Sequence, residues 1–590
     1  MQAQLQKAIS KAVEKITGLD LKPADISIFH PENEKFGDFS SNIALVLANK
    51  VKKNPLELAE LIVQKLKNNE TMEQCSNIKI APPGFVNITV KKDWLIKELR
   101  ETIKQGSQYG QLGLLKGKRI MVEYAHPNTH KQFHIGHLRN ITNGEAIVRI
   151  LEALGAKVFR TNYQGDVGLH IAKCLWAICQ GPALTFPPVK SADVKAGPLH
   201  SLDEKVEFLA KAYVKGNKAY ETDPKAKQEI LKINKNIYDQ SDSKINSLWK
   251  QTRQWSLAYF ERIYKRVYTH FDRYYFEREV AEPGKKIVLQ DLKKGIFVKS
   301  KGAIIFPGSK YGFHDRVFIT GEGNPTYEAK DMELGRLQFS EYHPDLIIHN
   351  VGPEQSGYFQ VVFEALAQVF PHTRGKEYHL AYGWVRLKKG KMSSRQGNII
   401  KGEWLLDEAK KRIKKTFPEV SDQTAEMIAV GAVKYSFLKV SPSTEVAFDF
   451  KESISLEGNS GPYLQYTYCR CQSVLHKSNV NEDGPAFAKA TAGKPLHTLN
   501  QEELVILRTL YKFPEVVKQA GETYSPNFVC NFLYDLAQKY NVFYNRHRII
   551  QDKGSKDKSQ EQFRLNLTMA TAQILKSGLD ILGIKTPGQM

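Results

Sequence analysis

The stretch from Met121 to Glu145 constrains the fold of this chain most strongly. It opens with an apolar pair and an acid at Glu123, which is typical of a buried strand that delivers a carboxylate at its carboxyl end. A Pro-Asn-Thr break follows at 127–129, and apolar residues at helical spacing begin at Leu138. This order of strand, break and helix predicts the carboxyl edge of a parallel sheet, where ligands bind.

Two histidines, His134 and His137, stand where this helix is expected to begin, with Gly136 between them. The free N–H groups and the dipole of a helix N-terminus favour a bound anion. Imidazoles three residues apart share one side of the first turn and can hydrogen-bond phosphate oxygens, while Gly136 leaves room for a flat ring. Taken alone, such a pair is more often a surface, core or metal-binding pair than a nucleotide site.

Length and charge indicate a large protein with an anionic partner. The 590 residues predict roughly three or four domains. The formal net charge of +22 favours a polyanion such as RNA, although a generally basic proteome would give the same value.

Cysteine usage and hydropathy predict the compartment. The six cysteines form no framework of spaced pairs, which favours reduced thiols in a cytosol. The N-terminus lacks a signal-peptide core, and no apolar run approaches the roughly 20 residues that cross a bilayer. We therefore expect a soluble, cytoplasmic protein.

Residues 1–112 have the pattern of a small α+β domain. Apolar residues at helical spacing between 5 and 16, and again from 43 to 47, predict two helices. Alternation from 78 to 90 around a Pro-Pro-Gly turn predicts paired strands.

The middle of the chain contains further predicted strands with polar ends. A strand at 158–163 leads to Asp166, which could line a pocket or merely form a turn. A stretch from about 180 to 300, largely helical and rich in lysine, interrupts the alternation of strand and helix, and we interpret it as an insertion. A strand at 346–348 again ends in polar residues.

Two later segments have chemistry that suits a ligand. Tyr327 and Asp331 are four residues apart, so on a helix a phenol and a carboxylate would face one planar cation together, although such a pair more often lies on a surface. The Gly-flanked basic run from Lys388 to Asn398 suits a triphosphate, although most charge runs are solvated faces.

From Ser460 onward the pattern is helical. Residues 540–548 interleave aromatic, amide and basic side chains, a combination that can stack on and hydrogen-bond unpaired bases. Half of these aromatics must face the helical core, so the spacing leaves open which of them would meet RNA.

The string around the two histidines resembles the HIGH signature of class I aminoacyl-tRNA synthetases, in the version carried by arginyl-tRNA synthetases. The residues that carry this resemblance are Pro127, Asn128, Lys131, His134, Ile135, Gly136, His137 and Arg139. The second signature, KMSKS, is resembled by Lys391, Met392 and Ser393, with Ser394 in place of its second lysine.

The resemblance covers nearly the whole chain and implies an α/β multidomain fold. Its parts would be an N-terminal additional domain over 1–112 that contacts the tRNA elbow, a Rossmann-type parallel-sheet catalytic domain over 113–455, and an α-helical anticodon-binding bundle over 456–590. The catalytic domain would contain the helical insertion at about 180–300.

The resemblance also implies a reaction and its partners. L-Arginine and ATP, accompanied by Mg²⁺, would give arginyl-adenylate and diphosphate, and tRNA(Arg) would then accept the arginyl group. We expect a monomer that has no membrane association and no metal held tightly by the protein.

Residue roles follow from the same resemblance. Catalysis would fall to His134, His137, Lys131 and Lys391, with Lys131 replacing the lysine missing at Ser394. ATP would be bound by His134, Gly136, His137, Gly352, Lys391, Met392 and Ser393. Arginine would be bound by Glu123, Asn128, His137, Tyr327, Asp331 and Gln355. Contacts to tRNA are expected from Tyr540, Tyr544 and Asn545.

Three alternatives remain at this point. The chain could be a class I synthetase for another amino acid, such as lysine or cysteine. It could be a non-catalytic RNA-binding paralogue, against which the intact His134, His137 and Lys391 argue. It could also be a metal-dependent hydrolase that uses the two histidines.

Overall fold

The computed structural model describes residues 1–180, 201–388, 400–478, 498–551 and 558–590. Contacts within the chain divide it into two units. One unit comprises Met1–Tyr109, Val474–Phe513 and Gln538–Gln573, and the other comprises Gly110–Ser473, Pro514–Ala537 and Ile574–Met590. The C-terminal helices thus contribute residues to both units.

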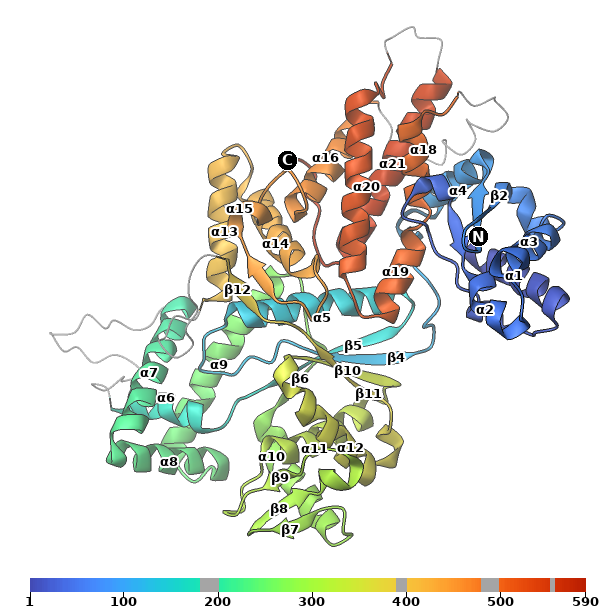
Figure 1. The fold of residues 1–590 in the computed structure, drawn as a ribbon. Helices are drawn as coiled ribbons and strands as arrows, with labels where there is room; N and C mark the ends of the chain where they lie inside the picture. The colour runs from blue at the N-terminus through green and yellow to red at the C-terminus, as the bar shows by residue number, and fades with distance from the viewer. Residues whose placement is uncertain (181–200, 389–399, 479–497, 552–557) are drawn as a thin grey trace. The chain divides into compact units, whose positions relative to one another are not determined.

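The larger unit contains a five-stranded parallel sheet in the order β11-β10-β4-β5-β6 (Figure 1). Its strands are β4 (Arg119–Glu123), β5 (Lys157–Gln164), β6 (Arg273–Phe276), β10 (Leu346–Val351) and β11 (Glu377–Ala381). The chain runs outward from β4 through β5 to β6, then returns to β4 and builds β10 and β11 on the other side. The crevice between the carboxyl ends of β4 and β10 is therefore the topological switch point, where doubly wound sheets bind ligands.

Apolar runs in β4 and β10 explain why these strands lie in the middle of the sheet. Met121 and Ile347 pack on one face with helices α10 (Glu277–Leu292), α11 (Tyr327–Tyr342) and α12 (Ser356–Val369). Val122 and Ile348 pack on the opposite face, beneath α5 (Ile135–Ala153). Strands covered by helices on both faces have to be apolar at successive positions. The predicted Rossmann-type parallel sheet is confirmed.

The predicted insertion at about 180–300 is not one continuous segment. Helices α6 (Leu169–Cys179), α7 (Leu202–Thr222), α8 (Pro224–Asp239) and α9 (Ser243–Arg266) form a helical cluster with its own apolar core. The chain then returns to the main sheet, because β6 pairs in parallel with β5. A small antiparallel sheet follows, made of β7 (Val298–Ser300), β8 (Ala303–Phe306) and β9 (Arg316–Ile319).

The chain after the five-stranded sheet is mostly helical. β12 (Val385–Leu387) and β13 (Val446–Phe448) pair in parallel. The helices after the sheet are α13 (Gly402–Thr416), α14 (Asp422–Leu438), α15 (Phe450–Ser453), α16 (Gly461–Lys477), α18 (Gln501–Leu510), α19 (Phe513–Glu522), α20 (Asn527–Arg546) and α21 (Lys558–Ile581). The expected helical C-terminal region is confirmed, and its segments belong to the two units given above.

The smaller unit begins with an α+β fold. An antiparallel sheet in the order β1-β3-β2 (Phe39–Ser41, Phe85–Val90 and Cys75–Ala81) packs against α2 (Ile43–Val51) and α3 (Pro55–Leu66). Helix α1 (Gln2–Thr17) contacts α3, and α4 (Lys92–Gln105) contacts α18 of the same unit. The apolar stripe predicted on the first helix is buried. Within this unit Asp38 is buried and lies 2.9 Å from the Arg508 guanidinium. No helix among the described residues is both long and apolar enough to cross a bilayer.

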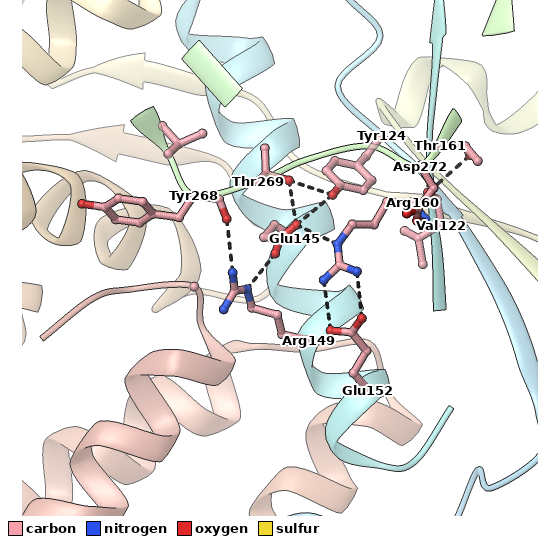
Figure 2. A network of polar contacts seen from close by, with 12 residues as sticks. Val122, Tyr124, Glu145, Arg149, Glu152, Arg160, Thr161, Tyr268, Thr269 and Asp272 are labelled. Atoms are coloured by element: carbon pink, nitrogen blue, oxygen red, sulfur yellow. Dashed lines mark hydrogen bonds and ion pairs between the residues drawn. The ribbon is translucent and has the colours of Figure 1, made fainter. Parts of the chain in front are cut away.

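A buried polar network fixes the C-terminal half of α5 (Figure 2). Glu145 is 1% exposed and accepts hydrogen bonds from Tyr124 (2.8 Å) and Thr269 (2.6 Å). Arg149 and Arg160 lie 2.7 and 3.3 Å from its two oxygens. Burial opposes ionisation of Glu145, but these two arginines outweigh it and lower its pKa. Charges from α5 and β5 therefore hold the helix rigidly against the sheet.

Candidate active site

A cavity of about 760 Å³ opens at the switch point between β4 and β10. Its walls come from the end of β4, the loop and first turn of α5, the first turn of α11 and the loop after β10. The predicted ligand-binding residues that line it are Glu123, Asn128, His134, Gly136, His137, Tyr327, Asp331, Gly352 and Gln355. Segments more than two hundred positions apart in sequence thus meet around one space.

The two histidines form the N-terminal cap of α5. The Nδ1 atom of His134 accepts the backbone N–H of Gly136 (3.1 Å) and of His137 (3.4 Å). In return, the Nδ1 atom of His137 accepts the backbone N–H of His134 (3.2 Å). The two rings stack with their centroids 3.7 Å apart. This reciprocal arrangement is a capping box built from imidazoles.

Burial determines the charge of both rings, and the capping contacts determine which nitrogen of each ring has the proton. Burial and the charge of Lys131 lower the pKa of His134 to about 4, and burial together with His134 lowers the pKa of His137 well below its ordinary value. Both imidazoles are therefore neutral at neutral pH. Because each Nδ1 accepts a backbone N–H, each ring has its proton on Nε2. That Nε2–H is the donor left for a ligand.

Two glycines allow side chains to approach the backbone closely. A Cβ atom at Gly136 would lie 2.9 Å from the His134 ring, so the flat ring that needs this space is that of His134 itself. A Cβ atom at Gly165 would lie 2.0 Å from Oδ1 of Asn128. Both glycines therefore shape the loop that precedes α5.

The part of the lining formed by β4, α10, α11 and the loop after β10 is acidic, and we call it the acidic wall. It includes the carboxylates of Glu123, Glu277, Glu328, Asp331 and Glu354. The guanidinium in the lining is that of Arg316, and it is hydrogen-bonded to Glu328 at 3.0 Å. An enclosed space with this charge distribution favours a cationic ligand.

Asp331 is the carboxylate best suited to receive a cation. The Tyr358 hydroxyl donates to its Oδ2 at 2.6 Å. Its Oδ1 is buried and has no hydrogen-bond partner among the described residues. Burial raises the pKa of Asp331 to about 7. A guanidinium placed against Oδ1 would satisfy this oxygen and restore the charge of the carboxylate.

Tyr327 lies on the same face of α11 as Asp331, as the spacing predicted. It is 58% exposed and lines the cavity. Lys330 is 4.6 Å from its ring centroid and forms a buried ion pair with Glu277 at 3.0 Å. Lys330 and Glu277 therefore neutralise each other, and the net negative charge of the wall comes from its other carboxylates.

Several predicted residues do not line the cavity. The ammonium of Lys131 lies 5.8 Å from the ring centroid of Tyr213 on α7, and burial lowers its pKa. Lys391, Met392 and Ser393, with Ser394, lie outside the described residues. The flanking Ile400 is described, and its carbonyl accepts the backbone N–H of Ile135 at 3.0 Å.

Asp166 is a structural acid and does not line the cavity. It is 1% exposed, pairs with Arg253 on α9 at 2.8 Å and accepts the backbone N–H of Arg278 at 3.0 Å. Its interpretation as a pocket residue is wrong, because its oxygens are used to join the helical cluster to α10.

The three residues predicted to bind tRNA lie on α20 in the smaller unit. Tyr540 has no exposed surface, and its hydroxyl donates to Thr568 at 3.2 Å. A side chain without exposed surface cannot stack on a base, so the assignment of Tyr540 to tRNA binding is wrong. Tyr544 is 37% exposed and Asn545 is exposed, so their assignment stays a prediction.

Sequence reasoning missed several side chains of this cavity. Glu277 directly follows β6, and an acid at a strand end is the signal that identified Glu123. This signal was missed because the sequence pattern placed β6 within the insertion. Tyr163, Tyr358 and Glu354 gave no signal, because only the folded chain brings them to the cavity. Among the described residues, no three His, Cys, Asp or Glu side chains are grouped so that they could hold a metal ion.

Comparison with known proteins matches three successive parts of the chain to families. The profile described as tRNA synthetases class I (R), catalytic domain, matches residues 98–450. The profile of the arginyl tRNA synthetase N terminal domain matches residues 3–90, and that of the DALR anticodon binding domain matches residues 464–590.

Full-length relatives give the same result. The arginine–tRNA ligase of Bacteroides thetaiotaomicron is 31% identical over 585 residues, with 94% of each chain covered. That of Treponema denticola is 31% identical over 570 residues, covering 95% of this chain and 94% of its own. Among solved structures, the Thermus thermophilus arginyl-tRNA synthetase has a TM-score of 0.78 at 23% identity, with both chains covered completely, which shows a shared fold.

Proposed function

The chain belongs to the class I arginyl-tRNA synthetase family, and from that membership we propose that it joins L-arginine to tRNA(Arg) at the expense of ATP. The observation that carries this proposal is the Oδ1 atom of Asp331, which is buried and has no hydrogen-bond partner within the described part of the chain, in an acid-lined cavity that is also lined by the histidine cap of α5. One wall suits a guanidinium, and the other suits a polyphosphate.

The amino acid would lie along the acidic wall. Its guanidinium would meet Asp331, with Tyr327 and Gln355 lining the same end of the cavity. Its α-ammonium and carboxylate would lie toward Glu123, Asn128 and His137. Arginine has cationic groups at both ends, and the lining supplies carboxylates from β4 and from α11 to match them.

The nucleotide would lie over the N-terminus of α5. The Nε2–H groups of His134 and His137 would donate to its oxygens, with Gly136 and Gly352 lining the same region. Neutral donors of this kind, aimed at an oxygen whose negative charge increases, stabilise a transition state without a proton being transferred. We assign further phosphate contacts to Lys131 and Lys391, and further nucleotide contacts to Met392 and Ser393. ATP would enter as its magnesium complex.

The chemistry needs no nucleophile from the protein. A carboxylate oxygen of arginine attacks the α-phosphorus of ATP, the bond to the β-phosphate oxygen breaks, and diphosphate leaves. A ribose hydroxyl at the end of the tRNA then attacks the carbonyl carbon of the adenylate, loses its proton and displaces AMP. The side chains hold the reactants and stabilise charge during both steps.

The same membership supports the remaining assignments. The match to a DALR anticodon binding domain over 464–590 supports a tRNA contact by the C-terminal helices, with Tyr544 and Asn545 as candidates. We further propose that the enzyme works as a monomer in the cytoplasm.

Aminoacylation of a mixed tRNA pool with each amino acid in turn tests this proposal. Arginine alone should be attached, and lysine and cysteine should give no product. Attachment of a different amino acid would overturn the specificity, and no product with any amino acid would favour the non-catalytic paralogue.

A further inference from the structure

Two carboxylates with an imidazole between them form a buried row beneath the cavity, across three neighbouring strands. Glu123 ends β4, His349 stands opposite it on β10, and Glu377 begins β11. The Nδ1 atom of His349 lies 3.3 Å from a Glu123 oxygen, and its Nε2 atom lies 3.4 Å from a Glu377 oxygen. The exposed fractions of the three side chains are only 4–6%.

The His349 ring is held in this orientation by its neighbours. Phe359 and Phe363 of α12 pack against it with ring centroids at 5.2 and 5.3 Å. A ring packed in this way cannot turn its nitrogen atoms away from the two carboxylates. Gln338 of α11 donates to the second oxygen of Glu123, so both oxygens of this carboxylate are held from below.

The charges in the row depend on one another. Burial disfavours the charged form of His349, but Glu123 and Glu377 outweigh it and raise its pKa to about 10. Burial also opposes ionisation of Glu123, yet its contacts with His349 lower its pKa. Other titratable groups near the row include His126, His379, Asp331, Tyr163 and Tyr275.

We propose that His349 is a positioning residue for amino-acid binding, whose imidazolium keeps Glu123 ionised and correctly oriented to receive the α-ammonium of the substrate. This inference rests on the proposed function, because it assumes that Glu123 binds that ammonium. The physical reason is that a carboxylate buried without a cation becomes protonated, and a neutral carboxyl holds an ammonium only weakly. His349 provides this cation, and the second carboxylate, Glu377, favours its charged form.

The test compares arginine with des-aminoarginine, which keeps the guanidinium and the carboxylate but lacks the α-amino group. In His349→Gln the side chain can still donate a hydrogen bond to Glu123 but carries no charge. Arginine binding should weaken about 10- to 100-fold, as when one member of a buried charged pair is lost. Binding of des-aminoarginine and ATP should change less than about threefold. Equal losses for both amino-acid ligands, or no loss for either, would overturn the proposal.

Two further variants guard against misfolding and non-specific effects. Glu377→Gln leaves His349 in place but removes its second carboxylate, so it should give a smaller loss, again confined to arginine. His372→Gln makes the same substitution at an exposed histidine on the same unit and should bind both ligands as the unchanged protein does.

Nitrogen NMR of the histidine rings separates this inference from the proposed function. In the unchanged protein one ring should keep both nitrogens protonated at a pH of about 8, and this signal should be absent in His349→Gln. A neutral His349 would refute the inference even if the protein attaches arginine to tRNA at the normal rate. Failure of the unchanged protein to bind arginine would instead refute the proposed function.

Discussion

The Tyr358 hydroxyl donates a 2.6 Å hydrogen bond to one oxygen of Asp331 and leaves the other oxygen buried without a partner among the described residues. An unsatisfied buried acceptor costs on the order of 1–3 kcal/mol. Asp331, which lines the cavity, therefore offers an oriented acceptor, and a guanidinium that hydrogen-bonds to it recovers this free energy on binding.

Replacing Asp331 should remove arginine binding selectively. In Asp331→Asn the side chain keeps its shape and can still accept from Tyr358, but the guanidinium loses its anionic partner. Arginine binding should weaken by about 3–5 kcal/mol, as for a broken buried ion pair, while ATP binding stays the same. Calorimetric titration with each ligand measures both effects. Asp345→Asn, at an exposed ion pair with Lys118, is the matched control. Normal arginine affinity in Asp331→Asn would rule out this carboxylate as the specificity determinant.

Arginine affinity should rise with pH between about 6 and 8. In the free protein burial raises the pKa of Asp331 to about 7, so this carboxyl is largely protonated below that pH. A bound guanidinium favours the ionised form, and arginine binding must therefore release a proton. Calorimetry in buffers of different ionisation heat counts that proton. The release should disappear in Asp331→Asn, and proton uptake on binding would contradict the expected sign.

Two substitutions of His134 should separate its capping role from its ligand role. His134→Asn keeps an N-cap acceptor but loses the Nε2–H donor, so kcat for adenylate formation should fall about 100- to 1000-fold while thermal stability changes little. His134→Ala loses both functions and should also lose about 1 kcal/mol of stability. Diphosphate exchange and thermal melting make these two measurements. Comparable activity in the unchanged protein and His134→Asn would limit this residue to capping.

Glu145→Gln should destabilise the larger unit without touching the cavity. The substitution leaves Arg149 and Arg160 without the carboxylate that both contact, at a cost of about 3 kcal/mol in the free energy of unfolding. Glu207→Gln removes the exposed pair with Lys211 and should leave the free energy of unfolding nearly unchanged. Denaturant unfolding of both variants provides the comparison, and equal midpoints would show that the network contributes little.

The fold was more predictable than the details of the site. Apolar runs that end in Glu123 and at 346–348 identified two buried strands, because a doubly covered sheet leaves a local signature in sequence. Their pairing with each other came only from the structure. The spacing of Tyr327 and Asp331 correctly placed them on one face of a helix.

Features that depend on distant contacts were missed. β6 is only four residues long and begins with Arg273, so its pattern did not separate it from the preceding helices. The partners of buried acids could not be predicted from the sequence either. Asp166 follows a strand and joins α9 to α10, whereas Asp331 lies near the start of a helix and lines the cavity. Tyr540 lies within an aromatic-rich stretch, but only packing determines which of those rings is buried.

The position of β10 beside β4 has a consequence for synthesis of the chain. Until Leu346 and the residues after it leave the ribosome, β4 has an unpaired edge and Glu123 lacks the strand that holds it in place. The cavity at the carboxyl ends of β4 and β10 therefore cannot form on a nascent chain that stops before β10, whatever has already folded. A truncated product would expose the unpaired edge of β4, which is prone to aggregation and to recognition by quality control. It would bind no arginine.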